Sequence, residues 1–139
     1  MAGQGILSKG ITLSYKKDTE FVVIPDLQEV PELGGTVEKV EVTTLADGSK
    51  RYINGIKDYG DLAFKFLYDN SGEGASYRIL RGLEEAEGID EYKVELPDGT
   101  AFTFSASVAT KLDGASVNGA LTFTATLTLN SDMEVSNPA

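Results

Sequence analysis

The feature that most constrains the fold is a strict alternation of threonine and apolar residues near the end of the sequence. The apolar set is Leu121, Phe123, Ala125, Leu127 and Leu129, and threonine occupies every even position between them. A period of two predicts a β-strand with one buried face. A slip of one residue would carry a row of threonines into the core, so the register is well specified. The threonine face is small, uncharged and β-prone, and it suits either solvent or the surface of another subunit.

The rest of the chain predicts more strands of the same kind and one helix. Alternation predicts strands at residues 11–16, 21–24, 37–44, 62–68, 92–96 and 102–108, with a Pro-Asp-Gly-Thr turn at 97–100 between the last two. Residues 25–35 contain two prolines and a Gly-Gly pair, which predict irregular structure. Residues 75–87 show helical spacing, and Gly88 is predicted to provide a left-handed C-cap. The predicted fold class is mainly β, an antiparallel β-sandwich or barrel with one flanking α-helix.

At 139 residues the chain is predicted to form one domain, residues 1–139. We expect a short N-terminal arm at residues 1–9 and a mobile polar tail at residues 131–139. The first residues lack the basic start and apolar core of a signal peptide, and no apolar run approaches membrane-spanning length. We therefore expect a chain that is made in a cytoplasm and does not bind a membrane.

Residues 45–59 form an unusually long predicted loop, with at most a brief strand at 51–53. Loops of this length are uncommon in compact domains, and they are usually functional or disordered. This one carries apolar side chains and a basic pair that suit a docking surface: Leu45, Lys50, Arg51, Tyr52, Ile53, Ile56 and Tyr59. The alternative is an ordinary long hairpin that packs on its own subunit.

Composition argues against most catalytic and nucleic-acid-binding functions. The chain has no cysteine and no histidine, which removes the commonest nucleophile, general base and metal ligands. The segment starting at Asp69 does not match a calcium-binding loop, because Leu80 occupies the last position, where a glutamate is required. Twelve basic residues against 22 acidic ones give a net charge of −10, which opposes binding to nucleic acid or anionic membrane. We expect no enzyme activity, no cofactor and no metal.

Four segments follow one another in a specific order along the chain: VEVTTL at residues 40–45, YINGIKDYGD at 52–61, FKF at 64–66 and KVELPDGT at 93–100. Together they resemble the tail tube (major tail) proteins of long-tailed, non-contractile bacteriophages, the siphophages. A helix lies between the third and fourth segments, and the threonine strand follows them, so the resemblance covers residues 10–129. Two departures concern Asn54, where the family pattern has proline, and the absence of a glycine soon after Leu129.

The resemblance implies a structural virion protein whose subunits form hexameric rings. These rings would stack by self-assembly into a tail tube, through which DNA ejection occurs. Implied partners are further copies of the chain, a tape measure protein, a tail tip or initiator complex and a tail terminator. DNA would pass through an acidic bore without specific binding. The implied location is the virion tail, assembled in the host cytoplasm, and residues 45–59 become a subunit interface.

Two other functions stay open at this point. The same architecture would serve the tube of a contractile injection or secretion system. A monomeric β-sandwich binding module is the alternative of a different class, although the sequence shows neither the exposed aromatic platform nor the secretion signal that such modules usually carry.

Overall fold

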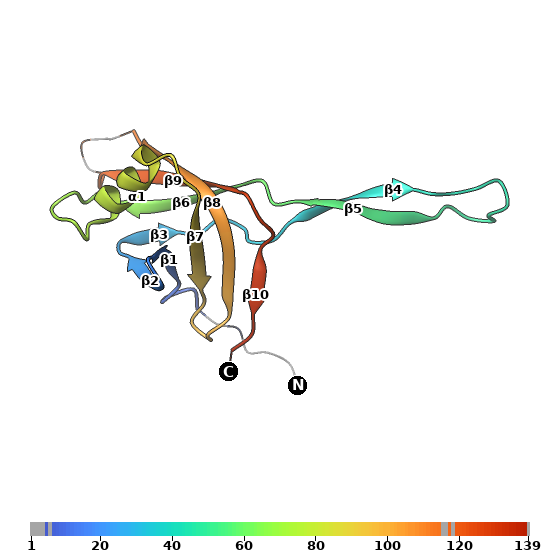
Figure 1. Cartoon of the computed structure of the whole chain (residues 1–139), viewed down its shortest axis with the longest axis horizontal. Coiled ribbons are helices and arrows are strands. Elements are labelled where there is room, and N and C mark those ends of the chain that lie inside the picture. Colours follow the sequence, from blue (N-terminus) through green and yellow to red (C-terminus); the bar gives the residue numbers. More distant parts are fainter. Residues whose placement is uncertain (1–4, 6, 115–116, 118, 139) are drawn as a thin grey trace.

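The computed structural model describes residues 5, 7–114, 117 and 119–138, which form a mainly β structure with one helix (Figure 1). The elements follow the chain in this order: β1 (Thr12–Lys17), β2 (Glu20–Ile24), β3 (Leu27–Glu29), β4 (Thr36–Glu41), β5 (Tyr52–Asp58), β6 (Asp61–Leu67), α1 (Ser76–Glu85), β7 (Asp90–Glu95), β8 (Ala101–Leu112), β9 (Thr122–Leu129) and β10 (Glu134–Ser136). Two sheets are present among the described residues. One is the large sheet of the body, and the other is the hairpin of β4 and β5.

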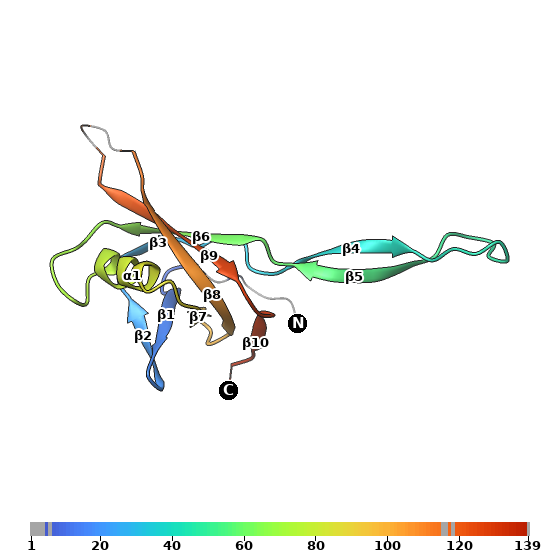
Figure 2. The same cartoon turned by 45° about the horizontal axis from the view of Figure 1, so that its top comes forward.

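The body is an eight-stranded antiparallel sheet in the order β2-β1-β7-β8-β9-β6-β3, with β10 beside β8. Strand β8 holds the sheet together because it changes partner along its length. Its residues up to Ala106 pair with β7, and its residues from Ala106 onward pair with β9. The two halves of the sheet lie at different angles around β8 and enclose a common core (Figure 2). The predicted class is confirmed, although the strands of the sandwich form one continuous sheet instead of two separate ones.

Aromatic residues fill the space between the two halves of the sheet. Phe66 and Phe123 stack with their ring centroids 5.4 Å apart, and Tyr92 stacks on Phe104 at 6.2 Å. Helix α1 closes this core with Leu80, which is fully buried. Burying an aromatic side chain contributes a large area to the core and favours these offset stacks. The core is therefore built by the apolar positions that the alternating pattern identified.

The threonine strand has the predicted register. The side chains of Phe123, Ala125 and Leu127 are fully buried, while the threonines between them lie on the outer face. Thr122 and Thr124 each donate a hydrogen bond to the carboxylate of Asp113, at 2.7 and 2.9 Å. These bonds hold the pKa of Asp113 below its usual value, with the Thr122 bond contributing most. The outer face thus contains local polar bonds that fix the strand end.

One buried polar group in the core lacks a partner. Tyr92 is fully buried, and its hydroxyl makes no hydrogen bond among the described residues. Burial raises the pKa of this phenol, because the ionised form would lose its hydration. An unpaired buried hydroxyl costs about 1–3 kcal/mol.

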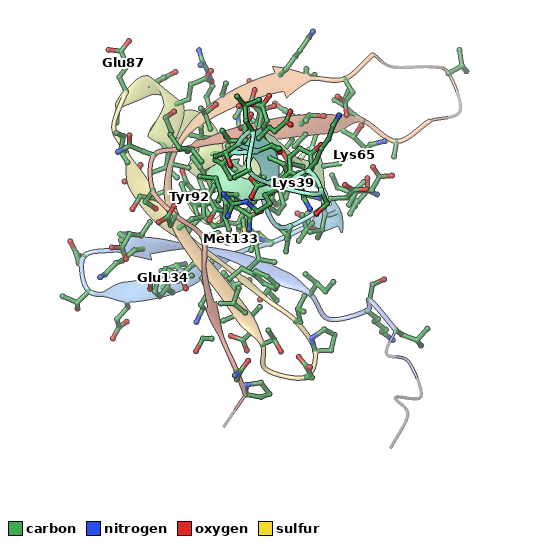
Figure 3. The ribbon with its side chains drawn as sticks, turned by 90° about the vertical axis from the view of Figure 1, so that its right-hand side faces the viewer. Lys39, Lys65, Glu87, Tyr92, Met133 and Glu134 are labelled. Atoms are coloured by element: carbon green, nitrogen blue, oxygen red, sulfur yellow. The ribbon has the colours of Figure 1, made fainter. Side chains whose placement is uncertain are left out.

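The helix differs from its prediction at the C-terminal end. It spans Ser76–Glu85, and the left-handed residue is Glu87, with φ of 53°, instead of Gly88. The last turn tightens because the Glu87 N–H bonds to the carbonyl of Glu84, so the chain reverses one residue early. In Figure 3 the Glu87 carboxylate points away from the body. A residue with a Cβ pays about 1–2 kcal/mol for this left-handed conformation.

Three further segments are more regular than predicted. Strand β3 lies inside the stretch expected to be irregular and pairs with β6, and β8 extends to Leu112 instead of ending at Val108. Strand β10 lies in the polar tail expected to be mobile, where Val135 pairs with Phe102 of β8. Each of these segments is short or polar and satisfies backbone groups of a neighbouring strand. The N-terminal arm at residues 1–9 falls mostly outside the described residues.

The prediction of a loop at residues 45–59 is also wrong in part. Tyr52–Asp58 forms β5, which pairs with β4, and the remaining connection is residues 42–51. Glycine and charged residues in β5 lower its strand propensity, so the segment resembles a loop until its partner β4 is considered.

Candidate assembly surface

The β4–β5 hairpin projects from the body as a long, thin arm (Figures 1 and 2). No part of the chain that the structure describes covers its apolar side chains. Leu45 and Ile56 are 107% and 93% exposed, and Ile53 and Tyr52 are 55% and 51% exposed. Apolar side chains held in water contribute no burial energy to the fold, and exposed apolar surface of this kind typically marks an interaction site. The alternative of a hairpin packed on its own subunit is therefore wrong for these four residues.

A glycine sets the geometry halfway along the hairpin. The register shifts between Val37↔Lys57 and Lys39↔Asn54, so β5 carries one extra residue as a bulge. A Cβ on Gly55 would lie 2.8 Å from the carbonyl oxygen of Glu38. Only glycine permits this close approach of the two backbones. A bulge also bends and twists the strand that carries it, so Gly55 determines where the tip points.

The tip of the hairpin is held together by Asp47. Its carboxylate accepts hydrogen bonds from the backbone N–H of Thr44 at 2.7 Å and from Nε of Arg51 at 3.0 Å. The bond from Thr44 is the main cause that lowers the pKa of Asp47. Val42 N–H bonds to the Arg51 carbonyl at 2.9 Å, which extends the ladder beyond the strands. The tip therefore has a defined shape that presents Leu45 outward.

The root of the hairpin contains the one predicted interface residue that is not on the exposed arm. Tyr59 is half-buried, and a Cβ on Gly35 would lie 3.2 Å from its ring. Gly34 precedes β4 with φ of 134°, and Gly60 follows β5 with φ of 65°. A glycine with positive φ therefore lies beside each strand at the root of the hairpin. Tyr59 thus packs across the base of the hairpin, against Gly35 just before β4.

The structure brings the other predicted residues together on one arm. Leu45, Lys50, Arg51, Tyr52, Ile53 and Ile56 are all exposed there. The prediction missed Val40, which lies opposite Ile53 and is 47% exposed. The alternation in residues 37–44 identified Val40 as an apolar position, but it did not identify the strand opposite. The role of the predicted residues as a subunit interface remains a prediction.

The hairpin also differs from the body in charge. Residues 36–58 hold four basic and four acidic side chains, which cancel: Lys39, Lys50, Arg51 and Lys57 against Glu38, Glu41, Asp47 and Asp58. The whole net charge of −10 therefore lies outside the hairpin. Figure 3, viewed from the hairpin end, shows Lys39 in front of the body. A neutral arm can approach an acidic body of another copy without the repulsion that two bodies would feel.

Within the described residues no group of three or more acidic side chains is placed to hold a metal ion. The one described helix, α1, is too short and too polar to cross a membrane.

Known proteins resemble this chain both in sequence family and in architecture. The family model for the phage tail tube protein matches residues 4–137. No curated protein matches the sequence. A chain in the anti-feeding prophage baseplate, 6-fold symmetrised, is similar, with a TM-score of 0.75, 15% identity and coverage of 99% of this chain and 98% of that one.

Two further solved structures share the fold. A chain in the tail of an empty gene transfer agent particle with C6 symmetry has a TM-score of 0.74 and 16% identity, and covers 95% of this chain and 99% of that one. A chain in the sheath/tube terminator of an extracellular contractile injection system has a TM-score of 0.74 and 10% identity, covering 98% and 99%. At such low identity these likenesses establish only the fold, whereas the family match spans nearly the whole sequence. The chain belongs to the phage tail tube protein family.

Proposed function

We propose that this chain polymerises as stacked hexameric rings into the tail tube of a siphophage, and that DNA enters the host through the tube. The observation that carries the proposal is the projecting hairpin, whose apolar side chains nothing in the described part of its own subunit covers. The sixfold symmetry named for two similar structures supports a hexameric ring. Rings need heterologous contacts whose rotation closes, and an arm that reaches from one copy to another provides such a contact.

The proposed interface consists of the seven residues predicted from sequence: Leu45, Lys50, Arg51, Tyr52, Ile53, Ile56 and Tyr59. Burying each large apolar side chain would contribute about 1.5–3 kcal/mol before the cost of ordering it. Ion pairs of Lys50 and Arg51 with a neighbour would add about 0–1 kcal/mol each. The apolar side chains therefore dominate the proposed contact, and Tyr59 supports it from the root.

The whole chain, residues 1–139, would act as one tail tube domain in the virion. It would be assembled in the host cytoplasm with a tape measure protein, a tail tip or initiator complex and a tail terminator. The acidic balance of the chain supports a bore through which DNA slides without specific binding. Mobility-shift assays at low salt should show no complex; tight binding that weakens steeply with salt would contradict this part.

A second candidate is the tube of a contractile injection system. It is favoured by the similarity to chains from the anti-feeding prophage and from an extracellular contractile injection system. The two candidates share the ring and the hairpin contact, and they differ in whether a sheath surrounds the tube.

Negative-stain electron microscopy of purified, concentrated protein tests the proposal. Rings or hollow tubes with six subunits per turn are the expected result, and light scattering should rise with concentration. Protein that stays monomeric at every concentration, even with a tail tip initiator present, would leave the monomeric binding module as the better explanation. Ile53→Asp should leave the subunit folded and stop polymerisation; loss of folding instead would mean that the hairpin belongs to the body.

A further inference from the structure

The body contains an apolar groove that no described segment fills. It lies between the segment around Ile11, strand β3 with the residues that follow it, and the start of β8, and its volume is about 800 Å³. Its apolar lining is half-buried and consists of Ile11, Leu27, Val30, Leu33, Leu96 and Phe102. All of these except Leu96 also pack against the core, so the core supports the walls of the groove.

The hairpin tip has the complementary properties. Leu45 stands fully in solvent at the end of a turn whose shape Asp47 fixes through Thr44 and Arg51. A preorganised side chain loses little conformational entropy on binding, which favours insertion into a preformed pocket. Residues 35–45 would span on the order of 30 Å when extended. The tip consequently stands far from the groove of its own body (Figure 1), and only another copy can bring the two together.

Charge favours the same pairing. Glu29 lines the groove, Glu32 lies a few residues further along the chain, and both side chains are exposed. Lys50 and Arg51 follow the tip on the hairpin, and Arg51 keeps a 58% exposed side chain although it is paired with Asp47. Lys9 also lines the groove, so Glu29, Glu32 and Lys9 together give this region a net charge of −1. The basic pair of the neutral arm can therefore approach the groove beside the two glutamates.

We propose that this groove receives the hairpin tip of a second copy, with Leu45 as the inserted side chain. The inference rests on the proposed function, because it names the site on the neighbouring subunit that the assembly hairpin binds. The contact is heterologous, because the tip of one copy meets the groove of the next, and in a closed ring every tip and every groove is then occupied.

Cysteine cross-linking tests the pairing, because the native chain has no cysteine to interfere. Leu45→Cys protein is co-assembled with Gln28→Cys protein, where Gln28 is an exposed residue that lines the groove. A short bismaleimide should then produce covalent dimers, and the double variant should produce a ladder of longer chains. Leu45→Cys combined with Ser107→Cys, an exposed position on the outer face of β8, is the matched control and should give no ladder.

Each other outcome has a distinct meaning. Rings or tubes without the Leu45–Gln28 dimer would overturn the groove and leave the proposed function standing. Dimers from Leu45→Cys protein alone would place tip against tip and also overturn it. Wild-type protein that never forms rings would overturn the proposed function and the groove with it.

A second measurement covers the case in which the thiol variants assemble poorly. Gln28→Trp fills the groove from an exposed position, and Leu45→Asp removes the inserted side chain. Each should raise the protein concentration needed for assembly about tenfold or more while the thermal unfolding midpoint stays near that of wild type. Val117→Asp changes an equally exposed apolar residue in another loop and should assemble normally. A folded Gln28→Trp protein that assembles at the wild-type concentration overturns the proposal.

Discussion

The body and the hairpin are both built from antiparallel strands, yet they use their apolar residues in opposite ways. In β9 the apolar face is fully buried, with Phe123 and Leu127 at 0% exposure. In the hairpin the apolar pair Val40 and Ile53 lies opposite one another and remains about half exposed. Alternation along a strand therefore shows that a face is suited to being covered. It does not show whether the cover belongs to the same chain.

The two regions also differ in what stabilises them. The body joins eight strands and a helix around one core, whereas the hairpin has two strands and no core of its own among the described residues. An isolated two-stranded hairpin is marginally stable in water. The tip bonds of Asp47 and the Tyr59 contact at the root support the hairpin at its two ends. The body should therefore behave as the cooperative unit, with the hairpin opening independently.

Hydrogen exchange should show the largest contrast. In the free subunit, amides of β6 and β9 should exchange only through global unfolding, which costs about 5–15 kcal/mol in typical domains. Amides of β4 and β5 should exchange through local opening that costs little, and they should become protected in the assembled tube. Equal protection of the hairpin in subunit and tube would contradict its role in assembly.

Truncating an apolar side chain in each region should give the next largest difference. Phe66→Ala removes a stacked core ring and should lower the free energy of unfolding by about 3–5 kcal/mol. Ile56→Ala, on the exposed arm, should change it by less than about 0.5 kcal/mol. Urea unfolding of both variants provides the measurement. A large loss of stability from Ile56→Ala would mean that the hairpin is part of the folding unit.

Replacing a glycine in each region should give smaller changes in stability, of opposite sign in the hairpin and the body. Gly55→Ala drives a Cβ into the Glu38 carbonyl, so it should cost the hairpin about 1–3 kcal/mol of local stability and impair assembly. Gly82→Ala lies within α1 with no heavy atom within 4 Å of the added Cβ, and it should stabilise the body by about 1 kcal/mol. Exchange rates of hairpin amides report the first change and thermal unfolding reports the second. An unaffected hairpin in Gly55→Ala would disprove the bulge geometry.

Lowering the pH should produce the smallest change in the stability of the body. The pKa of Asp113 is lowered in the folded state, chiefly by the Thr122 hydrogen bond, so its contribution to stability is present above about pH 4. That contribution disappears as the pH falls through the lowered pKa, and it should amount to less than about 1 kcal/mol. The urea midpoint of unfolding, measured as a function of pH, checks this. Asp113→Asn should make the midpoint less dependent on pH in this acidic range. Asp47→Asn, in the hairpin tip, is the control and should leave the unfolding of the body unchanged.

Most of the body could be predicted from sequence because its strands alternate strongly. The threonine strand, the turn at residues 97–100 and the helix around Leu80 all occur as expected. The errors concern segments whose structure depends on a distant partner. Strand β10 is polar and forms only because β8 has a free edge there. Likewise β5 contains Gly55 and two charged residues, and its partner β4 makes it a strand.

The candidate site was predictable in part for the same reason. Apolar residues in a long glycine-containing segment identified Leu45, Ile53 and Ile56, and all three are exposed. The sequence did not separate Tyr59, which packs at the root, from these residues. It also provided no indication of the groove, because Ile11, Leu33 and Phe102 come from distant parts of the chain and meet only in the folded body.

The pairing of β1 with β7 has a consequence for the order in which the molecule forms. This ladder joins Leu13 to Val94, so it closes only after most of the chain is present. Non-local pairings of this kind slow folding, because the conformational entropy of a long loop is lost before the stabilising contacts form. The turn at residues 42–51 closes locally and should form within microseconds. A newly made chain should therefore present its hairpin early and complete its groove late, so the rate of folding of the body limits how soon a subunit can accept a neighbour.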